Sequence, residues 1–355
     1  MCVCNGETFL GEAVESILNQ TFADFEFIII DDGSTDKTPE ILSGYARGDR
    51  RVRVFAQQNT GRSEALNRGI ELANADLIAR MDADDVSLPQ RLGEQYEFVR
   101  RHSEVGLLGG DIQLITPDSR NLGPWFAIAH GDVEIRRELA RSCQFIHPTV
   151  MMRKSVVLAA GGFRRAFSKA EDYDLFLRMA EHTQMANLEQ TVLLYRIHGG
   201  QASTREIARA AQCCLAARAA AAARGRGLPD PLIGVAEVNP EVLQSIGITI
   251  EQMRQEEIEL FRCRMAFLPA ADPESALQMI AKFVDTCASM PGQEDAAADA
   301  LLLAARMCYR RRQFARALAL AARAAAKRPA TAGQCIRMAV ARRARQLRAA
   351  QRAGS

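Results

Sequence analysis

The 355 residues suffice for about two domains with a substantial core, and their composition, 48% hydrophobic and 25% charged, is that of a globular protein. No stretch approaches the roughly 18 consecutive apolar residues that span a bilayer, and no charged segment followed by an apolar one marks a secretory signal. The nine cysteines include no CxxC pair, which argues against a zinc site or a disulfide framework and favours a reducing cytoplasm.

The net charge of +2 is unevenly distributed along the chain. From Ala300 to the end there are 14 Lys and Arg and no Asp or Glu, whereas the first 299 residues hold 31 basic and 43 acidic residues, a net charge of −12. An acidic body followed by a basic tail indicates two parts with different roles.

Short apolar runs alternate with amphipathic stretches over the first 115 residues. The runs predict strands at 25–30, 52–56, 76–81 and 105–109. The stretches between them predict helices at 8–20, 38–46, 62–73 and 88–102. This alternation is typical of an α/β fold with a mostly parallel sheet, right-handed crossovers and helices on both faces.

The remainder of the chain becomes increasingly helical. We predict strands at 145–153 and 190–198 and a helix at 171–182. From about residue 203 the sequence is rich in Ala and Arg, and we expect a helical connector and linker at 205–231, then an all-α basic region at 232–355. Within that region, residues 295–329 resemble one tetratricopeptide-like helix pair, although such units normally occur in about three copies.

Three carboxylates follow the predicted strand at 76–81. Asp82 and Asp84, two residues apart, lie on one face at the strand end, about 6.6 Å apart along the chain. Such a pair can share Mg²⁺ or Mn²⁺, whose coordination is completed by waters and substrate phosphates, or one acid can bind the cation and the other a ribose hydroxyl. The alternative is a solvated turn that caps the next helix, but capping requires one acid rather than three.

Two other acidic motifs fit the sequence less well. A calcium loop beginning at Asp82 would need Gly at its sixth position and Glu at its twelfth, where the chain has Ser87 and Gly93. A phosphatase of the haloacid dehalogenase type also places Asp-x-Asp after an apolar strand, but no later acidic pair with the required spacing completes its metal site.

A second acidic cluster stands in the segment IIIDDGSTDKTPE. Thr38, Pro39 and Glu40 there form an ordinary helix start, which leaves Asp31 and Asp32 unexplained. A carboxylate at a strand end can accept hydrogen bonds from the N–H of a uracil or the hydroxyls of a ribose. Both clusters lie where ligands bind in α/β sheets, at the carboxyl ends of strands.

The motifs and their order closely resemble the family 2 glycosyltransferases with the GT-A fold. The matching stretches cover about residues 1–204 and read CVCNGETFLGEAVESILNQTFADFEFIIIDDGSTDKT, NTGRSEALNRGI, MDADD, HPTVMMRKSV, GGFRRAFSKAEDYDLFLRM and LLYRIHGGQAS. The resemblance implies an inverting, metal-dependent transfer of a sugar from a nucleotide-diphospho-sugar, usually UDP-linked, to an acceptor in surface polysaccharide or glycoconjugate synthesis. Because no Gln-x-x-Arg-Trp motif is present, we expect transfer of single sugars.

The resemblance also implies roles for individual residues. Asp32 would bind the base, and Asp82 the ribose or the metal. The full set of implied donor-binding residues is Val3, Asn5, Asp32, Arg62 and Asp82.

On the metal and acceptor sides the resemblance implies five further residues. Asp84 would be the principal ligand of Mg²⁺ or Mn²⁺, with His198 beside it. Asp172 would be the base that deprotonates the acceptor hydroxyl, and His147 and Glu171 would lie at the acceptor site. An ionised carboxylate opposite the leaving group gives direct displacement with inversion. The alternative readings are a first-turn acid favoured by the helix dipole for Asp172 and a packed core side chain for His147.

The sequence departs from the family at its start. Relatives carry several apolar residues ahead of the stretch matching MCVCNG, and an aromatic residue often stands where this chain has Cys4. We therefore expect either that further strand residues lie upstream or that the nucleotide site is weakened. The second case leads to the alternative function, a catalytically weak relative that acts as a binding or scaffold protein through its helical C-terminal region.

The basic tail fits either a solvated helix or a peripheral contact with anionic lipid at the inner face of the membrane. Residues 337–353 place basic side chains at helical spacing beside a thin apolar side. No aromatic residue follows Phe314, so nucleic-acid binding is not expected. The expected partners are a nucleotide-sugar donor and a saccharide or lipid-linked acceptor, in a cytoplasmic setting.

Overall fold

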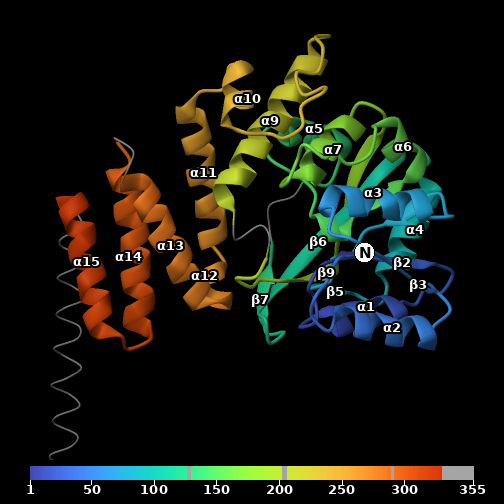
Figure 1. The fold of residues 1–355 in the computed structure, drawn as a ribbon, viewed down its shortest axis with the longest axis horizontal. Helices are drawn as coiled ribbons and strands as arrows, with labels where there is room; N and C mark the ends of the chain where they lie inside the picture. Colours follow the sequence, from blue (N-terminus) through green and yellow to red (C-terminus); the bar gives the residue numbers. More distant parts are fainter. Residues whose placement is uncertain (126–128, 202–205, 289–291, 330–355) are drawn as a thin grey trace, which may run out of the picture. The chain divides into compact units, whose positions relative to one another are not determined.

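The computed structural model describes residues 1–125, 129–201, 206–288 and 292–329, which fall into two compact units (Figure 1). The first unit comprises Met1–Ile197 and Glu206–Glu257. The second comprises His198–Arg205 and Ile258–Ser355. The chain therefore enters the second unit briefly, returns to the first, and then completes the second.

A three-stranded parallel sheet, in the order β1-β2-β3, begins the first unit. Its strands are β1 (Cys2–Val3), β2 (Phe27–Asp32) and β3 (Val52–Gln57). β2 reads as a nearly continuous apolar run because a parallel strand is buried on both faces. Helices α1 (Leu10–Leu18) and α2 (Thr38–Gly48) lie on one side of this sheet, and α3 (Arg62–Leu72) lies on the other (Figure 1).

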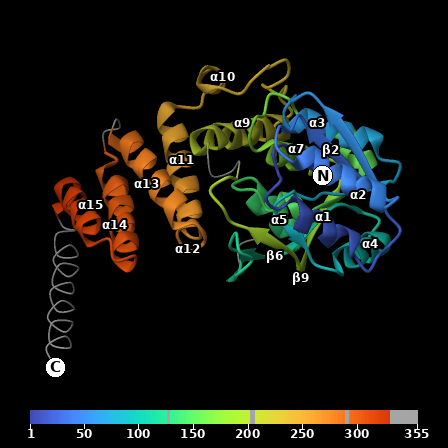
Figure 2. The same ribbon diagram turned by 60° about the horizontal axis from the view of Figure 1, so that its bottom comes forward.

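A second sheet of six strands is mixed rather than parallel. Its order is β4 (Leu77–Ala79), β8 (Met151–Arg153), β6 (Val105–Ile115), β9 (Gln184–Arg196) and β5 (Val86–Ser87), with β7 (Asn121–Pro124) pairing β6. β6 and β9 are parallel and run side by side in both views (Figure 2), and the other pairs are antiparallel. The predicted α/β fold with helices on both faces is confirmed. The antiparallel strand pairs of the second sheet were not predicted from the sequence.

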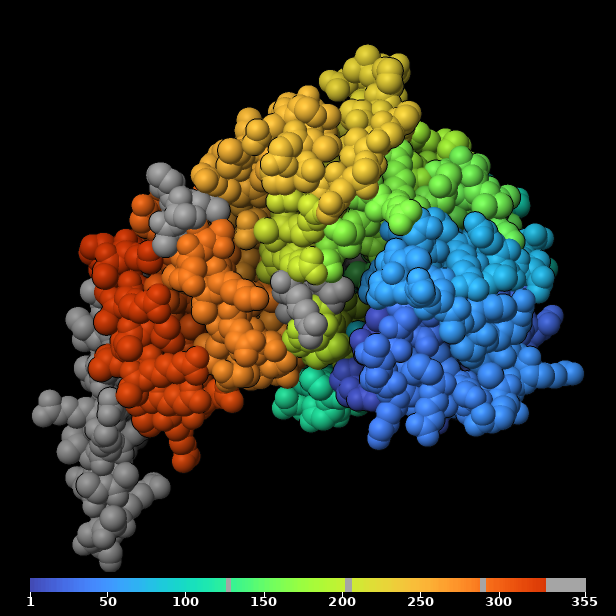
Figure 3. Space-filling view, in the orientation of Figure 1, coloured from blue at the N-terminus to red at the C-terminus, as the bar shows by residue number. Residues whose placement is uncertain are grey.

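Several further helices complete the first unit, and most of them contribute to one hydrophobic core. They are α4 (Arg91–Arg101), α5 (Asp132–Leu139), a 3₁₀ helix (His147–Thr149), α6 (Lys154–Ala159), α7 (Glu171–Met179), α9 (Ile207–Gly225) and α10 (Pro240–Ser245). The core cluster joins Tyr173 and Phe176 of α7 to Ala216 and Ala220 of α9. In the space-filling view, the blue surface of the first 70 or so residues adjoins the green surface of the segment that includes α6 and α7 (Figure 3).

This division differs from the predicted boundary after residue 204 and from the predicted connector and linker at 205–231. The segment 206–257 belongs to the first unit, because α9, α10 and the loops around them contribute buried apolar side chains to its core. Asp230 of the predicted linker is itself buried and bonded to Arg164 and Arg224.

The second unit is helical, as predicted for the C-terminal region. After α11 (Ile250–Met265), which begins in the first unit, come α12 (Leu268–Ala271), α13 (Pro273–Ala288), α14 (Glu294–Arg310) and α15 (Phe314–Lys327). The last two correspond to the predicted helix pair at 295–329. Across the described parts of the chain, no helix has both the length and the apolar character needed to cross a membrane. The basic segment 337–353 lies outside the described residues.

Candidate active site

Several residues predicted to bind donor and acceptor in the first unit converge from three elements. Asp82 follows β4, Arg62 begins α3, and Glu171 and Asp172 begin α7. Arg62 lies 3.7 Å from Glu171 (Nη1 to Oε1) and also interacts electrostatically with Asp82 and Asp172. One guanidinium therefore connects the acids of the β4 loop with those of α7.

Asp82, Asp84 and Asp85 offer a set of oxygen ligands for a divalent cation. One carboxylate oxygen from each lies within 4.8 Å of the others. Oδ2 of Asp85 is buried with no hydrogen-bond partner in the described structure, and burial followed by the charges of Asp84 and Asp82 raises the pKa of Asp85 well above its usual value. A hard cation would relieve this repulsion, so the residues present fit Mg²⁺ or Mn²⁺.

Arg80 keeps Asp82 ionised, a role that the sequence reading missed. Its Nη1 lies 2.6 Å from Oδ1 of Asp82, and its side chain is 4% exposed. Although burial opposes ionisation, Arg80 and Arg62 lower the pKa of Asp82 to about 2. The sequence did contain a signal for this contact. Arg80 ends an apolar run and stands two residues before Asp82, and residues two apart in an extended chain lie on the same face.

Arg196 positions the loop that carries the aspartates, and it too was missed. It is fully buried at the end of β9, where its backbone N–H donates to Oδ1 of Asp85 (2.8 Å) and its Nε donates to the carbonyl of Asp84 (2.8 Å). The guanidinium also donates to the Thr116 carbonyl and to Glu12 of α1. Because a buried cation needs several acceptors, Arg196 fixes the backbone of the loop that carries the aspartates against two other segments.

Asp32 holds a loop together in this structure. Its Oδ1 accepts from the N–H of Thr60 (2.9 Å) and from Nε2 of Gln57 (2.8 Å), and its Oδ2 accepts from the N–H of Gly61 (3.0 Å). These hydrogen bonds hold the backbone of residues 57–61, which leads into α3 and Arg62, in place. The predicted contact of Asp32 with the base stays a prediction.

Val3 and Asn5 place the first loop beside the loop that follows β2. Val3 is buried in β1, and the Asn5 side-chain oxygen accepts from the N–H of Thr35 (2.8 Å). Asn5 has a φ of 55°, in the left-handed region that Asn tolerates better than most residues. The backbone here turns sharply at the edge where a nucleotide would bind.

Asp172 is suited to accept a proton near neutral pH. Burial, with the neighbouring charge of Glu171, raises the pKa of Asp172 to about 7. Its side chain is still 24% exposed, so an acceptor can reach it. The N-cap residue Ala170 has a φ of 53°, an unfavourable conformation for alanine that sets the direction in which α7 begins.

His147 packs behind Asp172. Its ring is 6% exposed, contacts Phe163 and Phe176, and places Nδ1 3.8 Å from Oδ2 of Asp172. Burial, and then the charge of Arg80, lowers its pKa well below the usual value, so the imidazole is neutral. The structure thus places His147 next to the predicted base, and its predicted role toward the acceptor stays a prediction.

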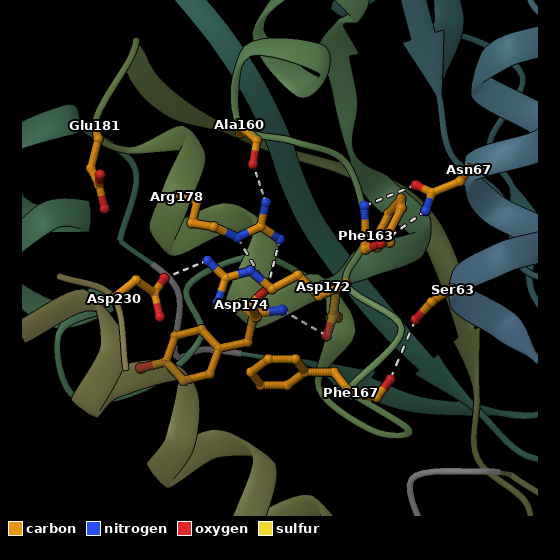
Figure 4. Close-up of polar contacts among 12 residues, drawn as sticks. Ser63, Asn67, Ala160, Phe163, Phe167, Asp172, Asp174, Arg178, Glu181 and Asp230 are labelled. Atoms are coloured by element: carbon orange, nitrogen blue, oxygen red, sulfur yellow. Dashed lines mark hydrogen bonds and ion pairs between the residues drawn. The ribbon is translucent and has the colours of Figure 1, made fainter. Parts of the chain in front are cut away.

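α7 is held in place by polar contacts on both sides (Figure 4). Within the helix, Asp174 accepts from Nη2 of Arg178 (2.6 Å). On the side of α3, Asn67 bonds both the N–H and the carbonyl of Phe163 (2.8 Å each). The loop that leads into α7 is thereby tied to α3, the helix that carries Arg62.

His198, the second predicted metal ligand, belongs to the second unit. Its Nδ1 accepts from the N–H of Gly200 (3.2 Å) within that unit. Its predicted role at the metal stays a prediction.

Comparison with known proteins identifies the family. Residues 1–161 match the family described as Glycosyl transferase family 2. The O-antigen biosynthesis glycosyltransferase WbnJ of Escherichia coli is 35% identical over 202 residues, 56% of this chain and 78% of WbnJ. The glycosyltransferase MJ1057 of Methanocaldococcus jannaschii is 31% identical over 195 residues, 54% of this chain and 67% of that protein.

A solved structure shares the fold at low sequence identity. It is S. aureus TarS 1-349 in complex with UDP-GlcNAc, with a TM-score of 0.52, 16% identity, and coverage of 89% of this chain and 87% of TarS 1-349. From the matched family and from the length over which WbnJ is similar, this chain belongs to the family 2 glycosyltransferases and is a glycosyltransferase.

Proposed function

We propose that this chain transfers a single sugar from a nucleotide-diphospho-sugar, UDP-linked, to an acceptor hydroxyl with inversion at the anomeric carbon. The observation that carries the proposal is the pairing, in one site, of an aspartate cluster at the end of β4 with Asp172, whose pKa is about 7. A cluster of three carboxylates fits a divalent cation that can in turn bind a diphosphate, and a carboxylate of that pKa fits the removal of a hydroxyl proton.

In the proposed reaction Asp172 is the general base. The acceptor oxygen forms a bond to the anomeric carbon while the bond from that carbon to the diphosphate oxygen breaks, and the electron pair leaves with the diphosphate. The proton of the acceptor hydroxyl passes to Asp172, which lies in the first turn of α7 and is partly open to solvent. Displacement from the side opposite the leaving group inverts the anomeric configuration.

The donor side is held by the β4 loop and α3. Asp84, together with Asp82, would hold Mg²⁺ or Mn²⁺, which when bound supplies positive charge to the leaving diphosphate. Arg80 keeps Asp82 ionised, and Arg196 fixes the Asp84 backbone. Arg62, 44% exposed at the start of α3, can add its charge to the phosphates.

We assign the acceptor to a saccharide or a lipid-linked saccharide of surface polysaccharide synthesis on the cytoplasmic side. The relative WbnJ is named for O-antigen biosynthesis, which supports this class of acceptor.

Titration calorimetry with a panel of UDP-, GDP- and dTDP-sugars, with and without Mn²⁺, tests the proposal. UDP-GlcNAc is a suitable first member. We expect one UDP-sugar to bind and to be slowly hydrolysed, with both signals strengthened by Mn²⁺. A folded sample that binds no nucleotide-sugar in either condition would refute the proposed activity.

The acidic limb of the pH–rate profile should report Asp172. Because the carboxylate must be ionised to accept a proton, kcat should rise as the pH passes about 7. In Glu171→Gln the neighbouring negative charge is gone and Arg62 is released toward Asp172, so the midpoint should move to lower pH by about one unit. Glu134→Gln, an exposed change on α5, is the control. A midpoint that does not move, or moves upward, would contradict the electrostatic role of Glu171.

A further inference from the structure

The loop 163–170 leads into α7 and its first-turn residue Asp172, and two different parts of the chain hold this loop. α3 bonds the backbone of the loop through Asn67 and Ser63 (Figure 4). The other contacts come from residues 206–238, the returning segment, with which the chain re-enters the first unit after its passage through the second. The position of the proposed base therefore depends on a part of the chain that follows it only after that passage.

The contacts of the returning segment are spread along the whole loop. The bonded pairs are Arg164 with Asp230, Ala166 with Val238, Ser168 with Arg209, and Lys169 with Glu206. In the last three pairs the bonded atoms lie 3.0, 3.0 and 3.1 Å apart. Since these partners run from one end of the loop to the other, the loop as a whole is fixed against the returning segment.

Arg164 connects the returning segment to α7 through buried charges. Its Nη2 bonds Oδ2 of Asp230, and its Nη1 lies 3.6 Å from Oδ1 of Asp174. The side chains of Asp174 and Asp230 are only 1% and 5% exposed. Asp230 is held in turn by Nη1 of Arg224 (2.6 Å) and by the N–H of Leu232 (2.9 Å). Because buried charges have to stay paired, the guanidinium of Arg164 is kept between the two acids.

The end of the loop has a backbone conformation that needs support. Ala170 has a φ of 53°, which is unfavourable for alanine and persists only where the surrounding contacts fix the chain. Ser168 and Lys169 supply such contacts just ahead of it, and the N–H of Asp174 donates to its carbonyl (3.1 Å). Asp172 comes two residues after Ala170, so the contacts that fix this conformation also fix the placement of the proposed base.

We propose that Asp230 and Arg209 of the returning segment are positioning residues for sugar transfer, which act on Asp172 through the loop 163–170. The inference rests on the proposed function, in which Asp172 is the general base. A displacement of about 1 Å at a reacting group can cost about 10²-fold in rate. Loosening the loop should therefore lower kcat and spare donor binding, because the proposed donor site lies on the β4 loop and α3.

The test compares Asp230→Asn and Arg209→Ala with the control Leu42→Ala, all in the full chain. Asp230→Asn removes a charge that pairs with Arg164, and Arg209→Ala removes the surface contact with Ser168. Leu42 is fully buried on α2 and lies outside the hydrophobic cluster that contains residues of the loop. Its truncation lowers the stability of the same unit at a distance from the loop.

We expect Asp230→Asn to lower kcat by at least about tenfold and Arg209→Ala by about threefold, with donor affinity within a factor of about three of the parent chain. Hydrogen exchange at the amides of Phe167 and Asp174 should become at least about tenfold faster in Asp230→Asn. Leu42→Ala should lower the midpoint of thermal unfolding but, well below that midpoint, leave kcat and the exchange of both amides unchanged.

The proposal is wrong if folded Asp230→Asn keeps the kcat of the parent chain, or if Leu42→Ala lowers kcat as much as Asp230→Asn does. Should Asp230→Asn fail to fold, Arg209→Ala decides, because its contact with Ser168 lies at the surface. A parent chain that transfers no sugar would refute the proposed function instead. Exchange at Phe167 and Asp174 would still show whether the returning segment holds the loop, and unchanged exchange would overturn that part as well.

Discussion

Asp172→Asn is expected to lower kcat for sugar transfer by about 10³-fold while leaving the donor affinity within a factor of about three. The amide has nearly the shape of the carboxylate but cannot accept the acceptor proton. Because Asp172 lies on α7 and not among the β4 aspartates, the loss should fall on the chemical step. Single-turnover rates together with donor titrations measure the two quantities separately.

The matched control is Asp285→Asn, an exposed acid on α13 of the second unit. It should leave both quantities unchanged. Circular dichroism and the thermal midpoint of Asp172→Asn should match the parent chain, since the Asn side-chain oxygen can still accept the hydrogen bond from the Tyr173 N–H. If a folded Asp172→Asn protein kept the kcat of the parent chain, Asp172 would not be the base.

Asp84→Ala is expected to abolish the Mn²⁺-dependent part of donor turnover, a loss of at least about 10²-fold, and to weaken Mn²⁺ binding by a similar factor. Loss of Asp84 leaves two carboxylates, and each already has one oxygen engaged: Asp82 with Arg80, and Asp85 with the Arg196 N–H. Electron paramagnetic resonance of free Mn²⁺ measures binding without relying on turnover.

Asp85→Ala separates ligation from folding. Because Asp85 is 1% exposed and accepts from the backbone N–H of Arg196, its removal leaves that buried donor unpaired and should lower the free energy of unfolding by about 1–3 kcal/mol. Asp84→Ala should change that free energy much less, and Asp285→Ala should change neither property. Mn²⁺ binding that survives Asp84→Ala at full strength would place the cation elsewhere.

Local sequence patterns predicted most of the strands and helices of the first sheet, but they misjudged the long strands of the second. β6 was predicted to end at residue 109 and continues to Ile115. Gly109 and Gly110 lie within the strand because β9 side chains fill the space beside them: a Cβ on Gly109 would lie 2.0 Å from Oδ1 of Asn187. That constraint comes from a segment 78 positions further on, which no local pattern contains.

The candidate site shows the same limit. The acids Asp82, Asp84 and Asp172 could be chosen from their spacing and from the family resemblance, because each stands next to a recognisable strand or helix. Arg196 could not, since its significance arises from contacts with Asp84, Thr116 and Glu12, three segments far apart in the sequence. Likewise the Ala-rich α9 was predicted only as part of a helical connector, because its role in the core depends on packing against α7.

The order of the segments along the chain limits where recombination can replace one of the two units. Because residues 206–257 complete the core of the catalytic unit after the chain has already entered the helical one, recombination near residue 204 would carry away α9 and expose Tyr173 and Phe176. A different C-terminal domain could replace the helical unit without this loss only if the fusion point lay beyond Glu257, inside α11.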